Sequence, residues 1–292
     1  MIKIRHYLTV YLLLVAFLAS GQTALRAQAA TTTGPEKGSL VIVGGGSVGD
    51  DILLKFIELA GGPEVPIVVI PTAAGQAVYD QDTGVAKAFR RLGAENVIVL
   101  HTDDPLEADR PAFTQPIENA GGVWFGGGRQ WRLVDAYGGT RSEAAFWKVL
   151  QRGGVIGGSS AGATIQGSYL ARGDTQNNQV MMGDHEVGFG FIQNIAIDQH
   201  VLARNRQFDL LTILEKKPEL LGVGLDEGTA IVVQGNSFEV LGRSYVLVYD
   251  QSFWSREGRE LKQLPAPNQQ FYFLRQGDRY DLALRKMIPV EE

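Results

Sequence analysis

The stretch Gly158-Ser159-Ser160-Ala161-Gly162 fits G-x-S-x-G, a pattern typical of a nucleophilic serine on a sharp turn between a strand and a helix. Residues beside such a serine must be small because the turn is tight, and the next backbone N–H groups can stabilise an oxyanion. In this frame Ser160 is the nucleophile, and Ser159 is expected to point away. The alternative is that one of the two serines caps a helix. The pattern therefore predicts acyl transfer, provided that the chain supplies a base.

A serine nucleophile needs a base, and beyond residue 29 the chain offers only His101, His185 and His200. His200 follows the apolar residues of "IAIDQH" and precedes a predicted helix, so we expect it at the same sheet edge as Ser160. His101 and His185 are interpreted as residues of solvated loops. Neither "HTDD" nor "DHE" has a convincing spacing for metal ligands, and no metal or other cofactor is predicted.

Charged residues near His200 and further along the chain could tune this base. Arg204 and Arg206 follow it closely, and their charges would lower its pKa or bind a substrate carboxylate. Asp226 and Glu227 end an apolar strand in "GVGLDEGTAIVV", where a carboxylate could orient the imidazole. The resulting order is serine, histidine, acid. In α/β-hydrolases the acid precedes the histidine, so that fold is disfavoured.

Two further strand ends are rich in glycine. Gly44–Gly49 fits G-x-G-x-x-G, but the next strand ends in "VVIPTAAGQ" and lacks the acid that would hold a ribose. A tight turn is therefore favoured there over a nicotinamide site. Residues 123–130, "VWFGGGRQ", could likewise form a turn, or could bring backbone amides to an oxyanion. The residues alone leave both interpretations open.

The elements that position these residues follow an α/β pattern. Apolar strands alternate with segments of helical character, which predicts a three-layer fold with a mostly parallel sheet flanked by helices. The chain after Leu220 is β-rich, and "QQFYFLRQGDRYDL" is predicted to be a final hairpin. We expect residues 39–292 to form a single domain. The clearest strands are predicted at 39–46, 65–74, 96–104 and 121–128, and the clearest helices at 50–62, 85–93 and 141–154.

The N-terminus has the pattern of a signal peptide. Lys3 and Arg5 precede the apolar "VYLLLVAFLA", and "ALRAQAA" supplies a small-x-small cleavage site after Ala29. The apolar run is about 12 residues, against roughly 20 for a membrane span, so a stable anchor is disfavoured. Residues 1–29 are therefore predicted to be a signal peptide, and residues 30–38 a polar linker. The protein is expected to be exported, to the periplasm or the cell exterior.

Composition excludes several classes of function. The 292 residues include 32 acidic and 27 basic ones, and cleavage of the signal peptide would remove only basic charge. An acidic chain of this kind is a poor candidate for binding nucleic acid, which requires clustered lysine and arginine. There is no cysteine, which excludes disulfides, thiol catalysis and a lipid-bearing N-terminal cysteine.

Four motifs in this order and spacing resemble the cyanophycinase family of serine peptidases: "FGGGRQ", "GGSSAGA", "IDQHVLARNRQFDLL" and "GVGLDEGTAIVV". The resemblance covers about residues 38 to 250. It implies a fold like that of class I glutamine amidotransferases, or flavodoxin-like, and a relationship to aspartyl dipeptidase. It also implies an acyl-enzyme mechanism and an acidic polymer as substrate. Members of the family cleave cyanophycin, a poly-aspartate with arginine on its side chains, and release β-Asp-Arg dipeptides.

The resemblance also implies roles for individual residues. The implied catalytic triad is Ser160, His200 and Glu227. The implied oxyanion donors are the amides of Ala161 and of Gly127 or Gly128. The implied substrate-binding residues are Gln130, Asp198, Gln199, Arg204 and Arg206.

Two positions depart from the family pattern. Arg129 stands where the family usually has an acid, and Asp209 stands where it tends to have a third arginine. An aspartate there would repel a substrate carboxylate or select a cation. Alternatives therefore stay open: a peptidase of the same fold for other acidic or isoaspartyl peptides, or a binding protein without catalysis. A homodimer is one assembly that the sequence allows.

Overall fold

Two β-sheets organise the part of the chain that the computed structural model describes, residues 31–82, 84–258 and 263–289. The predicted signal peptide lies outside these residues. The larger sheet has nine strands in the order β14-β13-β10-β9-β1-β5-β4-β2-β3. Its parallel strands are β1 (Ser39–Val43), β5 (Val155–Ser159), β4 (Gly122–Phe125), β2 (Ile67–Ile70) and β3 (Val97–Val99). Its antiparallel strands are β9 (Thr229–Gln234), β10 (Ser237–Gly242), β13 (Arg279–Asp281) and β14 (Lys286–Ile288).

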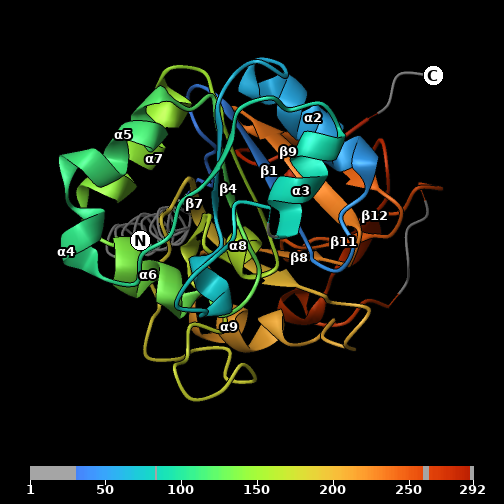
Figure 1. Cartoon of the computed structure of the whole chain (residues 1–292). Coiled ribbons are helices and arrows are strands. Elements are labelled where there is room, and N and C mark those ends of the chain that lie inside the picture. The colour runs from blue at the N-terminus through green and yellow to red at the C-terminus, as the bar shows by residue number, and fades with distance from the viewer. Residues whose placement is uncertain (1–30, 83, 259–262, 290–292) are drawn as a thin grey trace, which may run out of the picture. The chain divides into compact units, whose positions relative to one another are not determined.

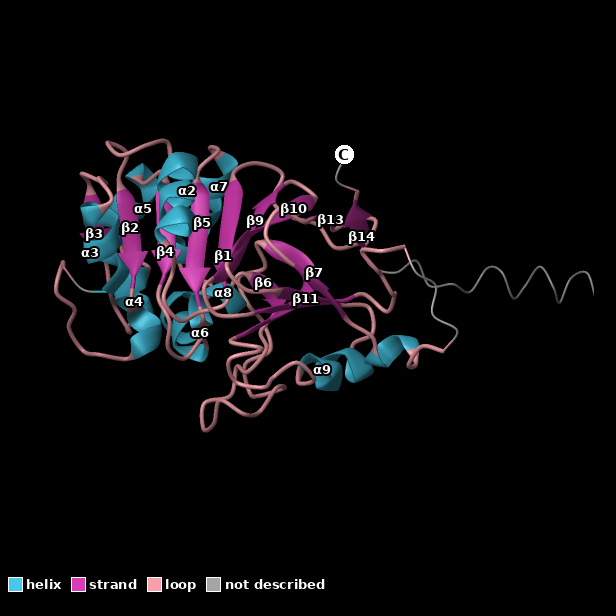
Figure 2. Cartoon of the chain, turned by 90° about the vertical axis from the view of Figure 1, so that its right-hand side faces the viewer, coloured by secondary structure: helices cyan, strands magenta, loops and turns pink. Residues whose placement is uncertain are grey.

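The smaller sheet has five strands in the order β12-β11-β8-β7-β6. They are β12 (Tyr272–Leu274), β11 (Val246–Tyr249), β8 (Leu221–Leu225), β7 (Ile192–Gln199) and β6 (Gly167–Tyr169). Strands β6, β7 and β8 run parallel, whereas β11 and β12 are antiparallel to their neighbours. Figure 2 shows this sheet below the larger one, at the end towards which the arrowheads of β2, β4 and β5 point. The carboxyl ends of the parallel strands thus face the second sheet.

Helices cover the larger sheet because its strands are apolar on both faces. Val41 and Val43 of β1 pack with helices on one face, and Leu40 and Ile42 belong to the core on the other. Helices α2 and α3 lie in front of the sheet in Figure 1. None of the described helices is long and apolar enough to cross a membrane. The helices are α2 (Asp50–Ala60), α3 (Gly84–Arg91), α4 (Pro105–Ala108), α5 (Pro111–Asn119), α6 (Trp131–Tyr137), α7 (Arg141–Gln151), α8 (Ala161–Thr164) and α9 (Leu210–Lys216), with 3₁₀ turns η1 (Thr72–Ala74) and η2 (Pro267–Gln269).

The predicted fold class is confirmed, with two differences in topology. The strands before His200 and Asp226 belong to the smaller sheet, although His200 was expected at the edge of the same sheet as Ser160. The prediction of a final hairpin is wrong. Strand β12 pairs with β11, whereas β13 pairs with β10 and β14 in the other sheet. Both errors have one cause: an apolar pattern shows that a strand is buried, but not against which partner.

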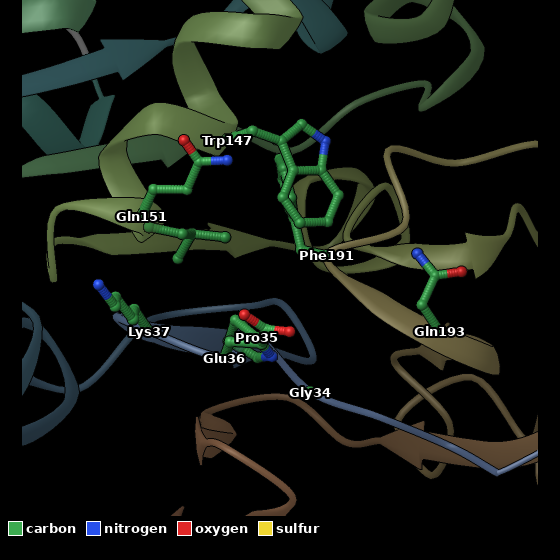
Figure 3. A pocket seen from close by; sticks show the side chains of 9 residues that line it. Gly34, Pro35, Glu36, Lys37, Trp147, Gln151, Phe191 and Gln193 are labelled. Atoms are coloured by element: carbon green, nitrogen blue, oxygen red, sulfur yellow. The ribbon is translucent and has the colours of Figure 1, made fainter.

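The segment from Thr32 to Gly38, expected as a polar linker, packs against the domain. Thr32 is fully buried and donates a hydrogen bond from Oγ1 to the Asn194 carbonyl, and Thr33 forms an antiparallel bridge with Gln193. This segment and α7 line a cavity of about 400 Å³, whose side chains are drawn in Figure 3. Its walls include Gly34, Pro35, Glu36, Lys37, Trp147, Leu150, Gln151, Phe191 and Gln193.

Candidate active site

Ser160 stands on a strained turn directly after β5. Its φ of 58° and ψ of −112° are unusual for a residue with a side chain, and its amide donates to the Val43 carbonyl at 3.0 Å. A Cβ on Gly158 would lie 2.3 Å from the Gly162 carbonyl oxygen, and one on Gly162 would lie 2.1 Å from the Phe125 carbonyl oxygen. The small residues of the motif are therefore required by close backbone packing.

The predicted helix after this turn is present as a single turn, α8. Ser160 occupies its N-cap position, yet makes no capping hydrogen bond with its side chain. The capping alternative therefore does not describe Ser160. Its hydroxyl is directed to the smaller sheet instead.

His200 joins the serine to an acid across the two sheets. Its Nε2 lies 2.9 Å from Ser160 Oγ, and its Nδ1 lies 2.6 Å from Oε1 of Glu227. A carboxylate can only accept, so Nδ1 carries the proton and Nε2 is free to accept one from the hydroxyl. Ser160 follows β5 of the larger sheet, and His200 and Glu227 follow β7 and β8 of the smaller one. The arrangement is that of a serine, its general base and an orienting acid.

The surroundings of His200 keep its imidazole neutral. Burial lowers its pKa, the charges of Arg204 and Arg206 lower it further, and Glu227 opposes them. The net pKa lies below the ordinary histidine value, so the ring can act as a base at neutral pH. Asp226, the neighbour of Glu227, takes a different role. It accepts the amides of Leu202 and Ala203 and so fixes the turn that follows His200.

The glycine-rich end of β1 makes room for this triad. A Cβ on Gly45 would lie 2.2 Å from Cε1 of His200, and one on Gly46 would lie 2.6 Å from Oε2 of Glu227. Both glycines have positive φ, 117° and 65°. The sequence of this segment predicted only a tight turn. Its contact with the triad depends on strands that are far apart in sequence, so no local pattern could indicate it.

The three backbone amides that were expected to bind the oxyanion belong to Gly127, Gly128 and Ala161. Gly127 lies beside Ser160, since a Cβ there would be 3.3 Å from the serine Cβ. Gly128 has a φ of 142° and packs so closely on η1 that a Cβ would lie 2.0 Å from the Ala73 carbonyl oxygen. Within the described residues, the amides of Gly127, Gly128 and Ala161 donate no hydrogen bond. They are free to bind an oxyanion at Ser160.

Arg204 and Arg206 bring positive charge to the site, and neither forms a direct ion pair with a described residue. Arg204 is exposed, and in the described part of the chain its side chain forms no ion pair. Arg206 is only 8% exposed, and its Nη1 donates to the backbone and side-chain oxygens of Gln199 at 3.3 and 3.2 Å. Burial lowers its pKa, and the nearby charges of Arg172 and Arg204 add to this effect, while Asp198 and Asp209 oppose it. An anionic ligand would relieve this repulsion.

Gln130 and Asp198 differ from the expectation that they contact substrate, because both are fully buried and engaged internally. Gln130 Nε2 donates to the carbonyls of Ala171 and Arg172 at 2.6 and 2.9 Å. Both Asp198 oxygens accept from Arg172, at 2.7 and 2.9 Å, and Arg172 is 1% exposed. Asp198 thus has a positioning role, whereas Gln130 is held by its Nε2 and its Oε1 has no hydrogen-bond partner among the described residues. Sequence reasoning missed Arg172, since a buried arginine carries no local signal.

The two departures from the family pattern converge on the same segment, Ala171–Asp174. Arg129 donates from Nη2 to the Asp174 carbonyl. Asp209 accepts from Arg172 Nη2 at 2.5 Å. The expectation that Asp209 repels a substrate carboxylate or selects a cation is therefore corrected, because its charge is already paired with Arg172.

His101 and His185 lie away from the nucleophile and have specific partners, unlike the solvated-loop residues that were expected. His101 Nδ1 lies 2.8 Å from Thr72 Oγ1. His185 bridges Asp184 and Asp135, at 3.0 and 2.8 Å. No group of three or more histidine, aspartate or glutamate residues within the described ranges could hold a metal ion.

Comparison with known proteins agrees with this geometry. The sequence profile of peptidase family S51 matches residues 40–241. Cyanophycinase of Geminocystis herdmanii (strain PCC 6308) is 30% identical over 257 residues, which cover 84% of this chain and 94% of the relative. Cyanophycinase of Trichormus variabilis (strain ATCC 29413 / PCC 7937) is 27% identical over 270 residues, which cover 87% of this chain and 88% of the relative.

A solved structure is also similar. A peptidase from an acI-B1 Actinobacterium aligns with a TM-score of 0.63 and 25% sequence identity, covering 85% of this chain and 98% of that one. The family profile spans more than half of the chain, including the turn of Ser160 and the segments of His200 and Glu227. The chain therefore belongs to peptidase family S51 and is a serine-type peptidase.

Proposed function

We propose that this peptidase hydrolyses cyanophycin, or related β-aspartyl peptides, and releases β-Asp-Arg dipeptides through an acyl-enzyme on Ser160. One observation carries the proposal: the Ser160–His200–Glu227 contacts of 2.9 and 2.6 Å stand beside two arginines without carboxylate partners. The relatives named cyanophycinase support the choice of polymer.

The chemistry follows from the hydrogen-bond directions. His200 Nε2 accepts the Ser160 proton while Oγ attacks the peptide carbonyl, and the negative charge on the carbonyl oxygen is held by the amides of Gly128 and Ala161. The imidazolium, stabilised by Glu227, then donates its proton to the leaving amine. Water enters, His200 removes its proton, and the acyl-enzyme is hydrolysed by the reverse sequence of transfers.

The arginines explain how an acidic protein could bind the carboxylates of its substrate. Arg206 is held by Gln199 and has donors left over, and exposed Arg204 stands on the same turn. Guanidinium groups bind carboxylates in a bidentate manner, so they fit the free α-carboxylate that each arginyl branch of cyanophycin carries. Their proximity to His200 places that carboxylate near the scissile bond.

The two adjacent serines provide a matched test. Ser160→Ala is expected to abolish release of β-Asp-Arg from cyanophycin, as measured by mass spectrometry, with folding intact by circular dichroism. Ser159→Ala is the control and should retain activity, because Ser159 makes no contact with His200. Dipeptide release by purified Ser160→Ala protein would refute the proposal. A wild-type protein that cleaves other isoaspartyl peptides but not cyanophycin would support the alternative substrate class.

We also propose that the mature protein acts outside the cytoplasm. The support is the basic, apolar and small-x-small pattern of residues 1–29. Cell fractionation tests it: the mature protein should be recovered from the periplasm or medium with an N-terminus near Ala30, whereas full-length protein confined to the cytosol would contradict export.

A further inference from the structure

A row of aromatic rings leads away from the active-site arginines. It consists of Phe208, Phe271, Phe273 and Tyr245, named here the aromatic row. Successive ring centroids lie 5.7, 5.8 and 5.7 Å apart. Phe208 stands two residues after Arg206, so the row begins at the edge of the proposed substrate site.

The aromatic row is exposed although it is apolar. Phe208 is 60% exposed, Tyr245 45% and Phe273 43%. Phe273 lies on the edge strand β12, opposite Leu247 of β11, on the face that packs with α9 and not on the face that joins the main core. Figure 1 shows β11 and β12 beside each other. Contiguous exposed aromatic surface of this kind marks a binding site more often than an accident of folding.

Charged groups accompany the row. An open groove of about 380 Å³ is lined by aromatic residues of the row together with Trp254, Arg256 and Arg275. The Arg256 guanidinium already stacks 5.0 Å above the Trp254 ring and pairs with Asp278. The exposed Arg275 side chain forms no ion pair with any described residue. The groove therefore combines open aromatic faces with one unpaired cation.

We propose that the aromatic row and its groove form a second, non-catalytic site that binds the arginyl branches of the polymer substrate. Each branch carries a guanidinium, which stacks on aromatic rings, and a carboxylate, which can pair with Arg275. Because the row starts beside Arg206, a chain held there would present neighbouring units to Ser160. This inference rests on the proposed function, and it adds a site that attaches the enzyme to an insoluble substrate.

The test separates attachment from catalysis. In a Ser160→Ala background, the triple variant Phe208→Ser, Tyr245→Ser, Phe273→Ser should co-sediment with insoluble cyanophycin at least about tenfold more weakly, since several stacking contacts are lost. With Ser160 intact, the triple variant should lose a similar factor in rate on the insoluble polymer. Its kcat/KM on a soluble β-Asp-Arg trimer should remain within about twofold of wild type. The single variant Arg275→Gln should weaken co-sedimentation without changing kcat/KM on the soluble trimer.

Controls make each outcome decisive. Leu54→Ser and Leu106→Ser remove apolar side chains that are at least as exposed as Phe273, 48% and 79%, from other surfaces, and should change neither co-sedimentation nor rate. Unchanged co-sedimentation of a folded triple variant would overturn the second site. A wild-type dimer that becomes a monomer in the triple variant would also overturn it, showing that a second copy covers the row. If wild type fails on the soluble trimer, the proposed function itself fails, independently of co-sedimentation.

Discussion

Gly45 and His200 are in direct contact: a Cβ atom on Gly45 would lie 2.2 Å from Cε1 of the imidazole. The glycine comes from the end of β1 in the larger sheet, and the histidine follows β7 in the smaller sheet. The His200 amide also donates to the Gly44 carbonyl at 2.9 Å. The end of β1 therefore packs against the catalytic base and fixes its position.

Gly45→Ala should inactivate the enzyme by displacing this imidazole. We expect kcat to fall by at least about 10²-fold, because small misplacements of catalytic groups have effects of that size. Gly62→Ala is the matched control, since Gly62 has a similar φ of 104° but open space around its Cβ position. Both variants carry the strain of positive φ, so only the clash distinguishes them. Equal activity of the two variants, measured at equal folded fraction, would contradict this role.

The pH profile should report the lowered pKa of His200. As pH falls, kcat/KM should decline about tenfold per pH unit only below the ordinary histidine pKa of about 6.5, since the buried ring resists protonation. The unfolded chain binds that proton more readily, so the free energy of unfolding should also decrease as pH falls through this range. This decline at low pH is the acid limb of the profile. An acid limb centred above pH 6.5 would contradict the expected shift.

Charge variants should move this acid limb in opposite directions. Arg204→Gln removes a cation that lowers the pKa of His200, so its limb should move to higher pH. Glu227→Gln removes the anion that raises it, so its limb should move to lower pH, while kcat falls by roughly 10²–10⁴-fold. Rate measurements on a soluble substrate from pH 4 to 9 test both signs, and shifts in the same direction would exclude these causes.

The buried ion pair of Arg172 with Asp198 should be needed for stability. Arg172→Met leaves a carboxylate that is 0% exposed without its partner, and it should lower the free energy of unfolding by about 3–5 kcal/mol. The double variant Arg172→Met, Asp198→Leu should recover part of that loss, because no charge stays buried. Urea denaturation measures both. If the double variant lost as much stability as Arg172→Met and Asp198→Leu lose together as single variants, the two side chains would not be directly coupled.

Asp209 should contribute stability and not substrate preference. Its carboxylate is 38% exposed, so its pair with Arg172 is partly screened, and Asp209→Asn should cost about 1 kcal/mol or less. Asp209→Arg brings two guanidinium groups together and should cost more. Neither variant should change the ratio of kcat/KM between β-Asp-Arg and β-Asp-Lys oligomers. A change in that ratio for Asp209→Asn would restore the idea that Asp209 contacts substrate.

The nucleophile and its partners could be proposed from sequence because their residue types are scarce. Ser160 lies in a motif whose small residues are imposed by the turn, and His200 is one of only three histidines beyond residue 29. The apolar strand before Asp226 and Glu227 indicated an acid there, and only the family resemblance distinguished Glu227 from Asp226. The roles of Gln130 and Asp198 could not be deduced in this way, since they depend on which side chains become buried against them.

Long-range partners account for what was missed. Arg172 lies in an irregular segment with a positive φ of 58°, and it is buried only because Asp198 and Asp209 come from elsewhere in the chain. Strand β8 is as apolar as those of the larger sheet, and β7 mixes apolar with polar residues, so the assignment of both to a second sheet requires knowledge of pairing. Periodicity determines whether a strand is buried and leaves its neighbours undetermined.

The triad is divided between the two sheets, with Ser160 on one side of the seam and His200 and Glu227 on the other. Proton transfer at Ser160 therefore depends on the position of one sheet relative to the other. Sliding by an ångström would break the 2.9 Å contact before any strand unravels. On heating, hydrolysis should stop at a lower temperature than the temperature at which β-structure is lost, so the enzyme would be inactive while still folded.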